Sequence, residues 1–315
     1  MRRALKILAG VIAIVLIALA GVVIHANHRI NKEEVLSADT DAPGRYMSIE
    51  GHRWHVLTVG NVKADTNGPP ILLIHGFSPV GHLMWQPWAD KLAAQRALIM
   101  PDNLGYGYSE RNTTPGPYYT IKSYSDSLAA ILDQLGVAQV EVIGHSFGGA
   151  IAARFALDYP TRVRRIVFID AAVYYERTAS DNIIQWPLGI GRAVAWHVTG
   201  GGPSSIITRF CKAQSSDRCL RLLRVKDSTD TIRAMMYTYH HSPDAEALVN
   251  DLPKLSSPSL VIWGANDPFF PASKGVRLAK EIKSDLVLID RGYHMPYLYA
   301  PDKVATRVLD FLNMP

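Results

Sequence analysis

The residue with the clearest chemical potential is Ser146, in the pentapeptide Gly144-His145-Ser146-Phe147-Gly148. This pentapeptide joins an apolar run over residues 140–143 to a helix-like stretch over residues 150–156. The pattern G-x-S-x-G in a strand–turn–helix setting is typical of a nucleophile elbow, whose tight turn lifts the serine hydroxyl above the carboxyl edge of a sheet. Because glycine is about 7% of residues, roughly one chain in ten of this length contains the bare pattern by chance. The setting, more than the pattern, predicts that Ser146 is a nucleophile.

A serine hydroxyl is hardly ionised at neutral pH, so it needs a histidine as base and a carboxylate that orients the histidine. Asp267 follows the late apolar run at 260–263, and His294 follows the next run at 286–289. Asp267 comes 121 residues after Ser146, and His294 comes 27 residues after Asp267, which is the order nucleophile, acid, base. Both lie at predicted carboxyl ends of strands, where ligands collect in open α/β sheets. We expect a catalytic triad of Ser146, Asp267 and His294.

The acid of this triad has one alternative. Asp170 directly follows the apolar run at 166–169, and this strand end also places a carboxylate at the same edge of the sheet. If Asp170 is the acid, Asp267 is only a turn residue before Pro268. If Asp267 is the acid, as we expect, Asp170 is a loop or hinge residue.

Acyl transfer also needs two backbone N–H groups that bind the negative oxygen of the intermediate. We expect one from Phe147, which directly follows the nucleophile at the start of a helix. The other is expected from Phe77, in the loop after His75-Gly76. We expect His75 itself to pack and form hydrogen bonds under this loop, without a part in catalysis.

Short apolar runs alternate with helix-like stretches along most of the chain. Predicted strands cover 45–50, 53–59, 71–74, 97–100, 139–143, 166–169, 260–263 and 286–289, and predicted helices cover 84–95, 121–135, 147–159, 273–283 and 300–312. This alternation predicts an α/β fold, with a mostly parallel eight-stranded sheet and helices on both faces. The alternation of strands and helices is absent over residues 173–243, which predicts a helical cap inserted after the sixth strand. The core is then formed by residues 45–172 and 244–315.

The N-terminus is strongly apolar. Residues 7–24 form a run of eighteen residues without a charged or polar side chain, after Arg2, Arg3 and Lys6. A membrane span needs roughly 17–25 such residues, whereas the apolar core of a signal peptide has about 7–15. We expect an uncleaved anchor in residues 1–26, with a cleaved signal peptide and a secreted protein as the alternative. The positive-inside rule then puts the main domain outside the cytoplasm, in the periplasm or the extracellular space. A polar linker is expected over residues 27–44.

The sequence contains two cysteines, Cys211 and Cys219. On one continuous helix they would lie about 12 Å apart, too far for a disulfide. Residues 213–217 have the composition of a turn, which would bring them together. An oxidising compartment outside the cytoplasm favours bond formation. We expect a disulfide, with two small buried thiols as the alternative.

Composition excludes several classes of partner. The net charge of +5 and the hydrophobic share of 48% are those of an ordinary globular protein with a basic surface. Lys and Arg are scattered and no nucleic-acid-binding signature occurs, so we expect no nucleic acid. His240 and His241 are adjacent, so their side chains diverge, and no H-E-x-x-H or paired C-x-x-C motif occurs. No G-x-G-x-x-G motif opens a helix after a first strand. We expect neither a metal nor a cofactor.

Five blocks of the sequence, in this order, resemble the α/β-hydrolase superfamily over about residues 45–313: His75-Gly76-Phe77, Asp102–Ser109, Gly144–Gly149, Trp263–Asp267 and His294. They are most similar to the capped branch that holds esterases, monoacylglycerol-lipase-like enzymes, C–C bond hydrolases and cofactor-free haloperoxidases. Epoxide hydrolases and haloalkane dehalogenases of this superfamily carry an aspartate at the elbow. Ser146 therefore argues against both of those activities.

Residues and resemblance together predict a serine hydrolase of carboxylic esters that acts through an acyl-enzyme on Ser146. A hydrophobic acyl or alcohol part is expected, because apolar residues of the cap would either roof a pocket or form the cap's own core: Trp186, Trp196, Ile206, Ile207, Met235, Met236, Tyr237 and Tyr239. Beside a membrane, the basic cap favours a lipid-like ester. The alternatives are a C–C bond hydrolase or perhydrolase with the same triad, and a weakly catalytic ligand-binding protein on this fold.

Overall fold

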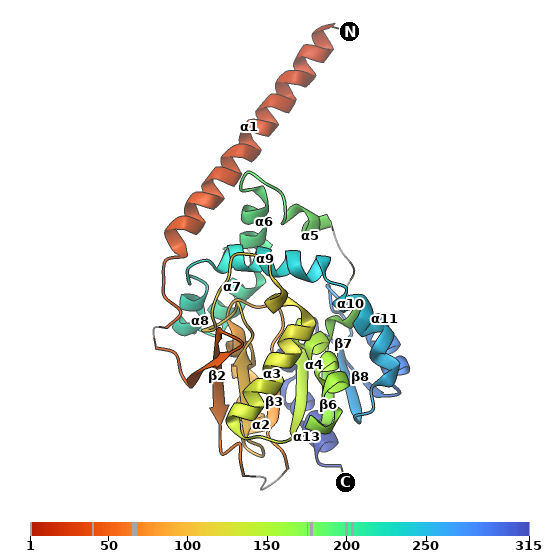
Figure 1. Ribbon diagram of the computed structural model, residues 1–315. Coiled ribbons are helices and arrows are strands. Elements are labelled where there is room, and N and C mark those ends of the chain that lie inside the picture. Colours follow the sequence, from red (N-terminus) through yellow and green to blue (C-terminus); the bar gives the residue numbers. More distant parts are fainter. Residues whose placement is uncertain are drawn as a thin grey trace.

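One eight-stranded sheet organises the molecule (Figure 1). The computed structural model describes residues 2–39, 41–64, 68–174, 176, 179–198, 201–202 and 205–314. The strand order is β1-β2-β4-β3-β5-β6-β7-β8; β2 is antiparallel to β1 and β4, and the other neighbours are parallel. The predicted α/β fold with a mostly parallel sheet is confirmed. The strands are β1 (Arg45–Ile49), β2 (His52–Val59), β3 (Ile71–Ile74), β4 (Leu98–Asp102), β5 (Val140–His145), β6 (Val163–Ile169), β7 (Ser259–Gly264) and β8 (Asp285–Ile289).

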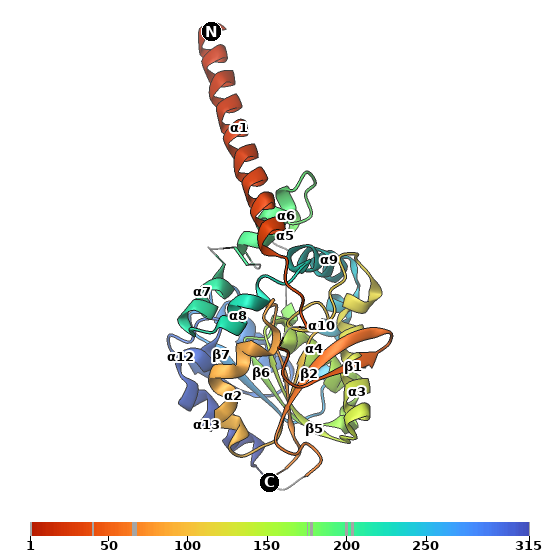
Figure 2. The ribbon, with the colours of Figure 1, turned by 90° about the vertical axis from the view of Figure 1, so that its left-hand side faces the viewer.

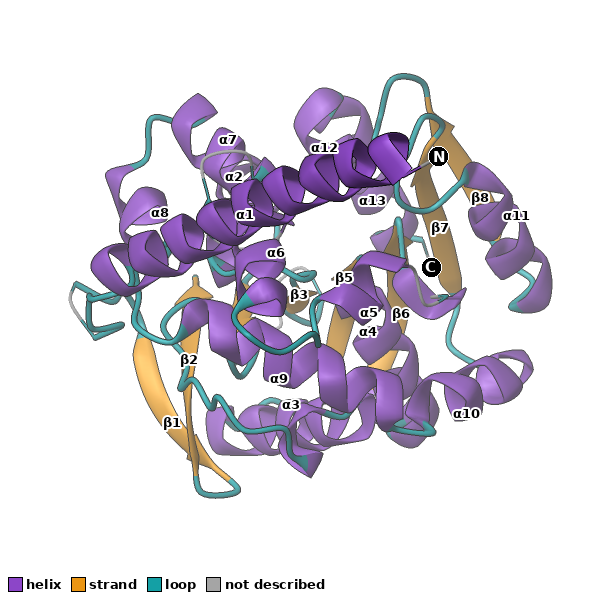
Figure 3. Ribbon diagram, turned by 90° about the horizontal axis from the view of Figure 1, so that it is seen from above, coloured by secondary structure: helices purple, strands orange, loops and turns teal. Residues whose placement is uncertain are grey.

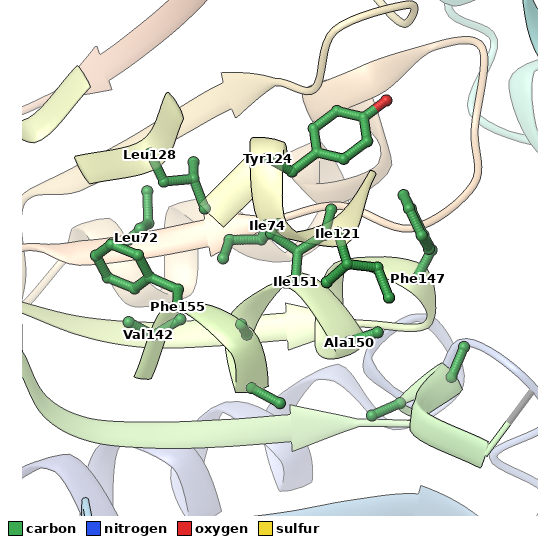
Figure 4. Close-up of a cluster of buried hydrophobic side chains, with 14 of the residues drawn as sticks. Leu72, Ile74, Ile121, Tyr124, Leu128, Val142, Phe147, Ala150, Ile151 and Phe155 are labelled. Carbon is green, nitrogen blue, oxygen red and sulfur yellow. The ribbon is translucent and has the colours of Figure 1, made fainter. Parts of the chain in front are cut away.

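Helices cover both faces of the sheet, because successive side chains of a strand point to opposite sides. In β3, Leu72 and Ile74 belong to a buried cluster with side chains of α3 (Ile121–Leu135) and α4 (Phe147–Asp158), whereas Ile71 and Leu73 belong to a second cluster with side chains of α2 (Gln86–Ala93) and α13 (Pro301–Leu312). Figure 4 shows the first of these layers, with Phe155 of α4 close to Leu72. The helices are α2 (Gln86–Ala93), α3 (Ile121–Leu135), α4 (Phe147–Asp158), α11 (Ala272–Glu281), α12 (Pro296–Tyr299) and α13 (Pro301–Leu312), with short 3₁₀ helices at Gly81–Trp85, Pro117–Tyr119, Pro160–Arg162, Ala172–Tyr174 and Leu252–Lys254.

Residues 173–243, between β6 and β7, form the cap segment. Its helices lie together beyond the carboxyl ends of the parallel strands (Figures 1 and 3). They are α5 (Ala179–Ile183), α6 (Ile190–Val198), α7 (Ile206–Ala213), α8 (Asp217–Leu222) and α9 (Ser228–His241), and α10 (Asp244–Asp251) follows them. The apolar cap residues, which were expected to roof a pocket or to form the core of the cap, differ in their exposure to solvent. Four are buried, namely Trp196, Ile207, Met235 and Met236, while Trp186 and Tyr237 are exposed.

The N-terminal apolar run belongs to one long helix, α1 (Arg2–Glu33), which projects from the molecule (Figures 1 and 2). By length and composition α1 is able to cross a membrane. Its most apolar window has a mean hydropathy of 3.2, and no residue of that window is buried. The expected linker over 27–44 is wrong for residues 27–33, which continue the helix. The physical reason is tertiary packing, because Ile30 is buried in a cluster with Ala193 and Trp196 of α6.

The two cysteines form a disulfide, as expected. Cys211 lies on α7 and Cys219 on α8, and their Cα atoms are 5.3 Å apart. The two helices are separate because the chain turns after Gln214, and Ser216 caps α8 by accepting a hydrogen bond from Cys219 N at 3.2 Å. Both cysteines are buried. The disulfide therefore joins the two arms of a helical hairpin inside the cap segment.

Replacing Cys211 and Cys219 together with serine should lower the free energy of unfolding by about 2–3 kcal/mol, because the unfolded chain loses the constraint of a short closed loop. Urea unfolding without reductant measures the difference between the variant and the parent protein. Thiol titration of the denatured, unreduced parent should find no free thiol. Two free thiols would show that the bond is absent from the protein.

Glu34 joins the end of α1 to the start of α9. Its carboxylate is buried and accepts hydrogen bonds from the backbone N–H of Thr229, at 3.1 Å, and from the Thr229 hydroxyl. Burial raises the pKa of Glu34 to about 7, although the bonds from Thr229 act in the opposite direction. The carboxyl group therefore changes its charge near neutral pH at the junction of α1 with the cap segment.

This buried acid predicts a pH-dependent stability. The folded pKa of Glu34 is about 7 and its ordinary value is 4.5, so its contribution is fully present below the ordinary value and is lost as the pH rises through 7. The loss amounts to about 3 kcal/mol at most. Glu34→Gln should remove this part of the pH dependence, which urea unfolding at about pH 5 and about pH 8 measures. An equal loss of stability in both proteins would contradict this role for Glu34.

Candidate active site

The elbow turn holds Ser146 in a strained backbone conformation. Ser146 follows β5 and precedes α4 with φ 53° and ψ −123°, a region that residues other than glycine rarely adopt. Two hydrogen bonds tie the turn to β6 and the chain after it, from Ser146 N to Ile169 O at 3.0 Å and from Ala172 N to Ser146 O at 2.9 Å. A Cβ atom at Gly148 would lie 2.1 Å from Ile74 O, so no larger residue fits there. The glycine of the G-x-S-x-G pattern is thus a steric requirement.

Asp267 and His294, in the loops after β7 and β8, form a hydrogen bond. His294 Nδ1 donates to Asp267 Oδ2 at 2.8 Å, and Asp267 Oδ1 accepts from the backbone N–H groups of Phe269 and Phe270 at 2.7 and 3.1 Å. Burial opposes ionisation of Asp267, but these hydrogen bonds and the charge of His294 outweigh it and hold the pKa of Asp267 below its ordinary value. Asp267 is an anion that fixes the Nδ1–H tautomer and leaves Nε2 of His294 to accept a proton.

The contact between Ser146 and His294 is not formed in this structure: within the described residues, no hydrogen bond uses the Ser146 hydroxyl. Instead, His145, which precedes Ser146, connects the elbow to the loop that contains His294. Its Nε2 donates to the backbone oxygen of His294 at 2.7 Å, and the two ring centroids are 4.9 Å apart. Catalytic hydrogen bonds of free enzymes commonly tighten only when substrate binds. The structure thus brings together Asp267 and His294, and leaves the last contact of the triad open.

His145 is a residue that the sequence analysis did not single out, although its place beside Ser146 in the pentapeptide was a signal. Burial, followed by the neighbouring charge of His294, lowers the pKa of His145 to about 3. The ring is therefore neutral and adds no positive charge beside His294. Its hydrogen bond fixes the backbone of the His294 loop against the elbow.

Asp170, the alternative acid, makes no hydrogen bond to His294 in the part of the chain that is described. Its Oδ1 accepts from Gly264 N at 2.8 Å, whereas its Oδ2 is buried without a hydrogen-bond partner among those residues. Burial, with the nearby charge of Asp267, raises the pKa of Asp170 well above its ordinary value. The pKa values of the two acids thus shift in opposite directions, and Asp267 is the one that is hydrogen-bonded to His294.

The two backbone groups expected to bind an oxyanion lie beside the elbow. A Cβ atom at Gly76 would lie 2.8 Å from the Cβ of Ser146, which places the loop with Phe77 directly against the serine. The ring centroids of Phe77 and Phe147 are 5.8 Å apart. Among the described residues no acceptor binds the N–H of Phe77 or of Phe147. Both N–H groups are thus left without an acceptor next to Ser146, as the expected oxyanion-binding role requires.

His75 has the place of a structural residue. Its Nδ1 donates to Gly76 O at 2.7 Å, and its Nε2 accepts from the backbone N–H of Asn103 at 2.9 Å. Burial lowers the pKa of His75 to about 4, so the ring is neutral. It joins the loop after β3 to the loop after β4 and has no ring nitrogen left for substrate.

Two side-chain clusters have the composition of metal ligands. Among the described residues, one is the pair of Asp267 and His294 with Asp170. The other consists of His55 in β2, His82 in the 3₁₀ helix Gly81–Trp85 and Asp102 at the end of β4. In the second, Asp102 accepts from the Nδ1 atoms of His55 and His82 at 2.8 and 2.9 Å, and from the backbone N–H groups of His82 and Tyr108 at 2.6 and 2.9 Å. Four donors satisfy this buried carboxylate without an ion, which fits a structural role in shaping the loop 103–109.

Aromatic rings surround the space beside Ser146. The ring of Phe147 lies 5.6 Å from that of Tyr239 on α9, and the His294 ring lies 5.1 and 5.4 Å from those of Phe269 and Phe270. Two surface cavities lie elsewhere, where the cap segment meets residues near β2 and β4, and neither is lined by Ser146. Aromatic rings thus pack around His294 and against Phe147, the residue after Ser146, and α9 of the cap segment contributes one of them.

Substitution of the two acids separates their roles. Asp267→Asn should lower kcat on a p-nitrophenyl ester by about 10⁴-fold, because the amide no longer holds the Nδ1–H tautomer of His294. Asp170→Asn keeps an oxygen for Gly264 N and removes no hydrogen bond to His294, so kcat should stay within about threefold of the parent value. Steady-state kinetics at neutral pH measures both. A larger loss from Asp170→Asn than from Asp267→Asn would make Asp170 the acid.

The chain matches the family model described as alpha/beta hydrolase fold over residues 69–301. Among curated proteins it is similar to a 2-hydroxy-6-oxo-2,4-heptadienoate hydrolase of Pseudomonas putida, with 29% identity over 260 residues that cover 78% of this chain and 89% of the relative. Two solved structures share the fold. A thermophilic esterase from Thermogutta terrifontis has a TM-score of 0.66 and 23% identity and covers 85% of this chain and 97% of its own. A membrane phospholipase A has a TM-score of 0.64 and 20% identity and covers 99% of this chain and 98% of its own.

The family match agrees with the physical description of the site. It covers well over half of the chain and includes the elbow with Ser146 and the loops with Asp267 and His294. The sheet of this chain, which is parallel except that β2 is antiparallel to both of its neighbours, is of the α/β type that the family description names. On both grounds, the chain belongs to the α/β-hydrolase-fold family.

Proposed function

We propose that this protein is a serine hydrolase that cleaves carboxylic esters with a hydrophobic acyl or alcohol part. The observation that carries the proposal is the 2.8 Å hydrogen bond from His294 Nδ1 to Asp267 Oδ2, at the same edge of the sheet as the strained Ser146. A neutral imidazole held in this tautomer is the base that a serine nucleophile needs. Membership of the hydrolase family agrees with this chemistry.

In the proposed reaction, Ser146 Oγ attacks the ester carbonyl carbon while Nε2 of His294 takes its proton. The carboxylate of Asp267 stabilises the imidazolium that forms, and the N–H groups of Phe77 and Phe147 bind the oxyanion. His294 then gives the proton to the leaving alcohol, which departs and leaves an acyl-enzyme. Water, activated by the same histidine, attacks the acyl carbon, releases the carboxylic acid and restores Ser146.

The side chains around Ser146 support an apolar substrate. The ring of Phe147, next to Ser146, packs with those of Phe77 and Tyr239, and Phe269 lies beside His294 while remaining about half exposed. Such walls bind hydrocarbon by burial of apolar surface and offer little to a charged group. A hydrophobic, lipid-like ester therefore fits the site better than a small polar one.

A second candidate is C–C bond hydrolysis with the same three residues. The observation that favours it is the 29% identity to a 2-hydroxy-6-oxo-2,4-heptadienoate hydrolase. The substrate named there is a carboxylate, and the aromatic walls beside Ser146 favour an uncharged group. Ester hydrolysis therefore stands first.

We also propose that α1 anchors the catalytic domain to a membrane from the outside of the cytoplasm. Its apolar window has a mean hydropathy of 3.2, and Arg2, Arg3 and Lys6 precede that window. The disulfide between Cys211 and Cys219 agrees with an oxidising compartment. Cleavage within residues 1–26 and secretion is the alternative, which the N-terminal sequence of the mature protein decides.

Hydrolysis of p-nitrophenyl esters, from acetate to palmitate, tests the proposed reaction. We expect kcat/KM to rise with acyl chain length, because each buried methylene adds about 0.8 kcal/mol of favourable transfer free energy, up to the capacity of the pocket. Ser146→Ala should lower the rate by at least about 10³-fold.

Three results would count against ester hydrolysis. No turnover of any ester, together with cleavage of a 2-hydroxy-6-oxo-dienoate, would establish the C–C hydrolase instead. Tight ligand binding with very slow labelling of Ser146 by a fluorophosphonate would indicate a ligand-binding protein. Unchanged ester hydrolysis in Ser146→Ala would place the chemistry at another residue.

A further inference from the structure

Helix α1 has two parts with different surroundings. From Leu5 to Ile24 its large apolar side chains are exposed, and the protein offers them no partner. From Ala26 onward one side of the helix is buried, because Ala26 and Ile30 pack with Trp196 of α6. Ile24 is exposed and Ala26 is buried, so the exposed apolar part of α1 ends where its contact with the cap segment begins.

The loop between α5 and α6 is fastened to α1 at this point. Asn27 Nδ2 donates to Gly189 O at 2.9 Å, and a Cβ atom at Gly189 would lie 2.6 Å from the same nitrogen, so only glycine allows this approach. Asn27 is three residues beyond Ile24, which is about 4.5 Å along the helix axis. The polar headgroup layer is roughly 5–8 Å thick on each side of the hydrocarbon core. A bilayer that encloses the apolar part of α1 therefore has its headgroups at the level of this loop.

The tip of the loop exposes large apolar side chains. Trp186 is 51% exposed and Leu188 is 89% exposed, the highest value among the large hydrophobic residues of the described chain. Leu188 also has a φ of 58°, a conformation that is unfavourable for a residue with a Cβ atom. The other five tryptophans are all at most 2% exposed. Packing within the protein thus does not explain why apolar side chains stand here.

We propose that the loop tip at residues 186–188 inserts into the membrane beside α1 and forms a second membrane contact of the protein. Tryptophan favours the boundary between headgroups and hydrocarbon, and leucine gains free energy by leaving water. Figures 1 and 2 both show this loop at the end of the body from which α1 leaves. Two contacts, one through α1 and one through the loop, hold the cap segment at a fixed orientation against the bilayer.

Trp186 is a natural probe for this contact, because it is the one exposed tryptophan of the described chain. The full-length protein is reconstituted into phosphatidylcholine–phosphatidylglycerol vesicles whose acyl chains carry bromine, and its tryptophan emission is compared with that in unbrominated vesicles. Bromine quenches only rings that reach the bilayer. We expect quenching in the parent protein and none in Trp186→Phe, whose remaining tryptophans are buried.

A matched control moves the exposed tryptophan to a different face. Val276 on α11 is 50% exposed, so Val276→Trp in the Trp186→Phe background gives a similarly exposed ring away from α1. This variant should show no quenching. Leu188→Asp should weaken the quenching of Trp186 several-fold, because a carboxylate resists transfer out of water, whereas Leu188→Met should preserve it.

The inference is wrong if Trp186→Phe is quenched as strongly as the parent protein, or if the ring at position 276 is quenched as well. It is also wrong if intact mass shows that the purified membrane protein lacks α1. An emission that changes with protein concentration, and not with bromination, would mean that the loop meets a second copy of the chain. None of these outcomes depends on ester hydrolysis, so the proposed reaction is tested separately.

Discussion

At Ser146 the chain turns from β5 into α4 with a φ of 53°. The end of β5, the start of α4 and the loop at Gly76 approach one another so closely here that their glycines have no room for a side chain. A Cβ atom at Gly144 would lie 2.5 Å from Gly148 O, and one at Gly76 would lie 2.8 Å from the Cβ of Ser146. Because all six residues of β5 are buried, the strand resists relaxation of the strain. The close approach also places the loop with Phe77 against Ser146 at the start of α4, so the proposed nucleophile and both proposed oxyanion donors depend on one steric arrangement.

Burial determines the charge of each group around this turn. N–H donors and His294 outweigh the desolvation of Asp267 and lower its pKa, whereas burial and the nearby charge of Asp267 raise the pKa of Asp170 well above its ordinary value. His75 and His145 have pKa values lowered to about 4 and about 3, which keeps both neutral. In the proposed reaction Asp267 and His294 therefore carry the acid–base chemistry, and His75 and His145 hold the loops in place.

The sequence predicted what local patterns determine. Buried apolar runs marked the strands, and the loops after β7 and β8 followed because parallel strands end at one edge of the sheet. The order nucleophile, acid, base favoured Asp267 but left Asp170 open, since both follow strands. The hydrogen bond from the imidazole to Asp267 and the desolvation of Asp170 also favour Asp267, and both depend on three-dimensional contacts. Residues 27–33 looked like a linker because their polar composition is local, whereas the packing of Ile30 on Trp196 joins segments far apart in the chain. The bond from His145 was missed for the same reason.

A crystal structure of the protein after reaction with a fluorophosphonate tests the central claim most directly. The account predicts phosphorus bonded to Ser146 Oγ, with the phosphonyl oxygen about 3 Å from the N–H groups of Phe77 and Phe147. Nε2 of His294 should then lie within hydrogen-bond distance of the adduct while its Nδ1 remains bonded to Asp267. An unmodified Ser146, or an adduct whose oxygen points away from both N–H groups with His294 out of reach, would contradict the account.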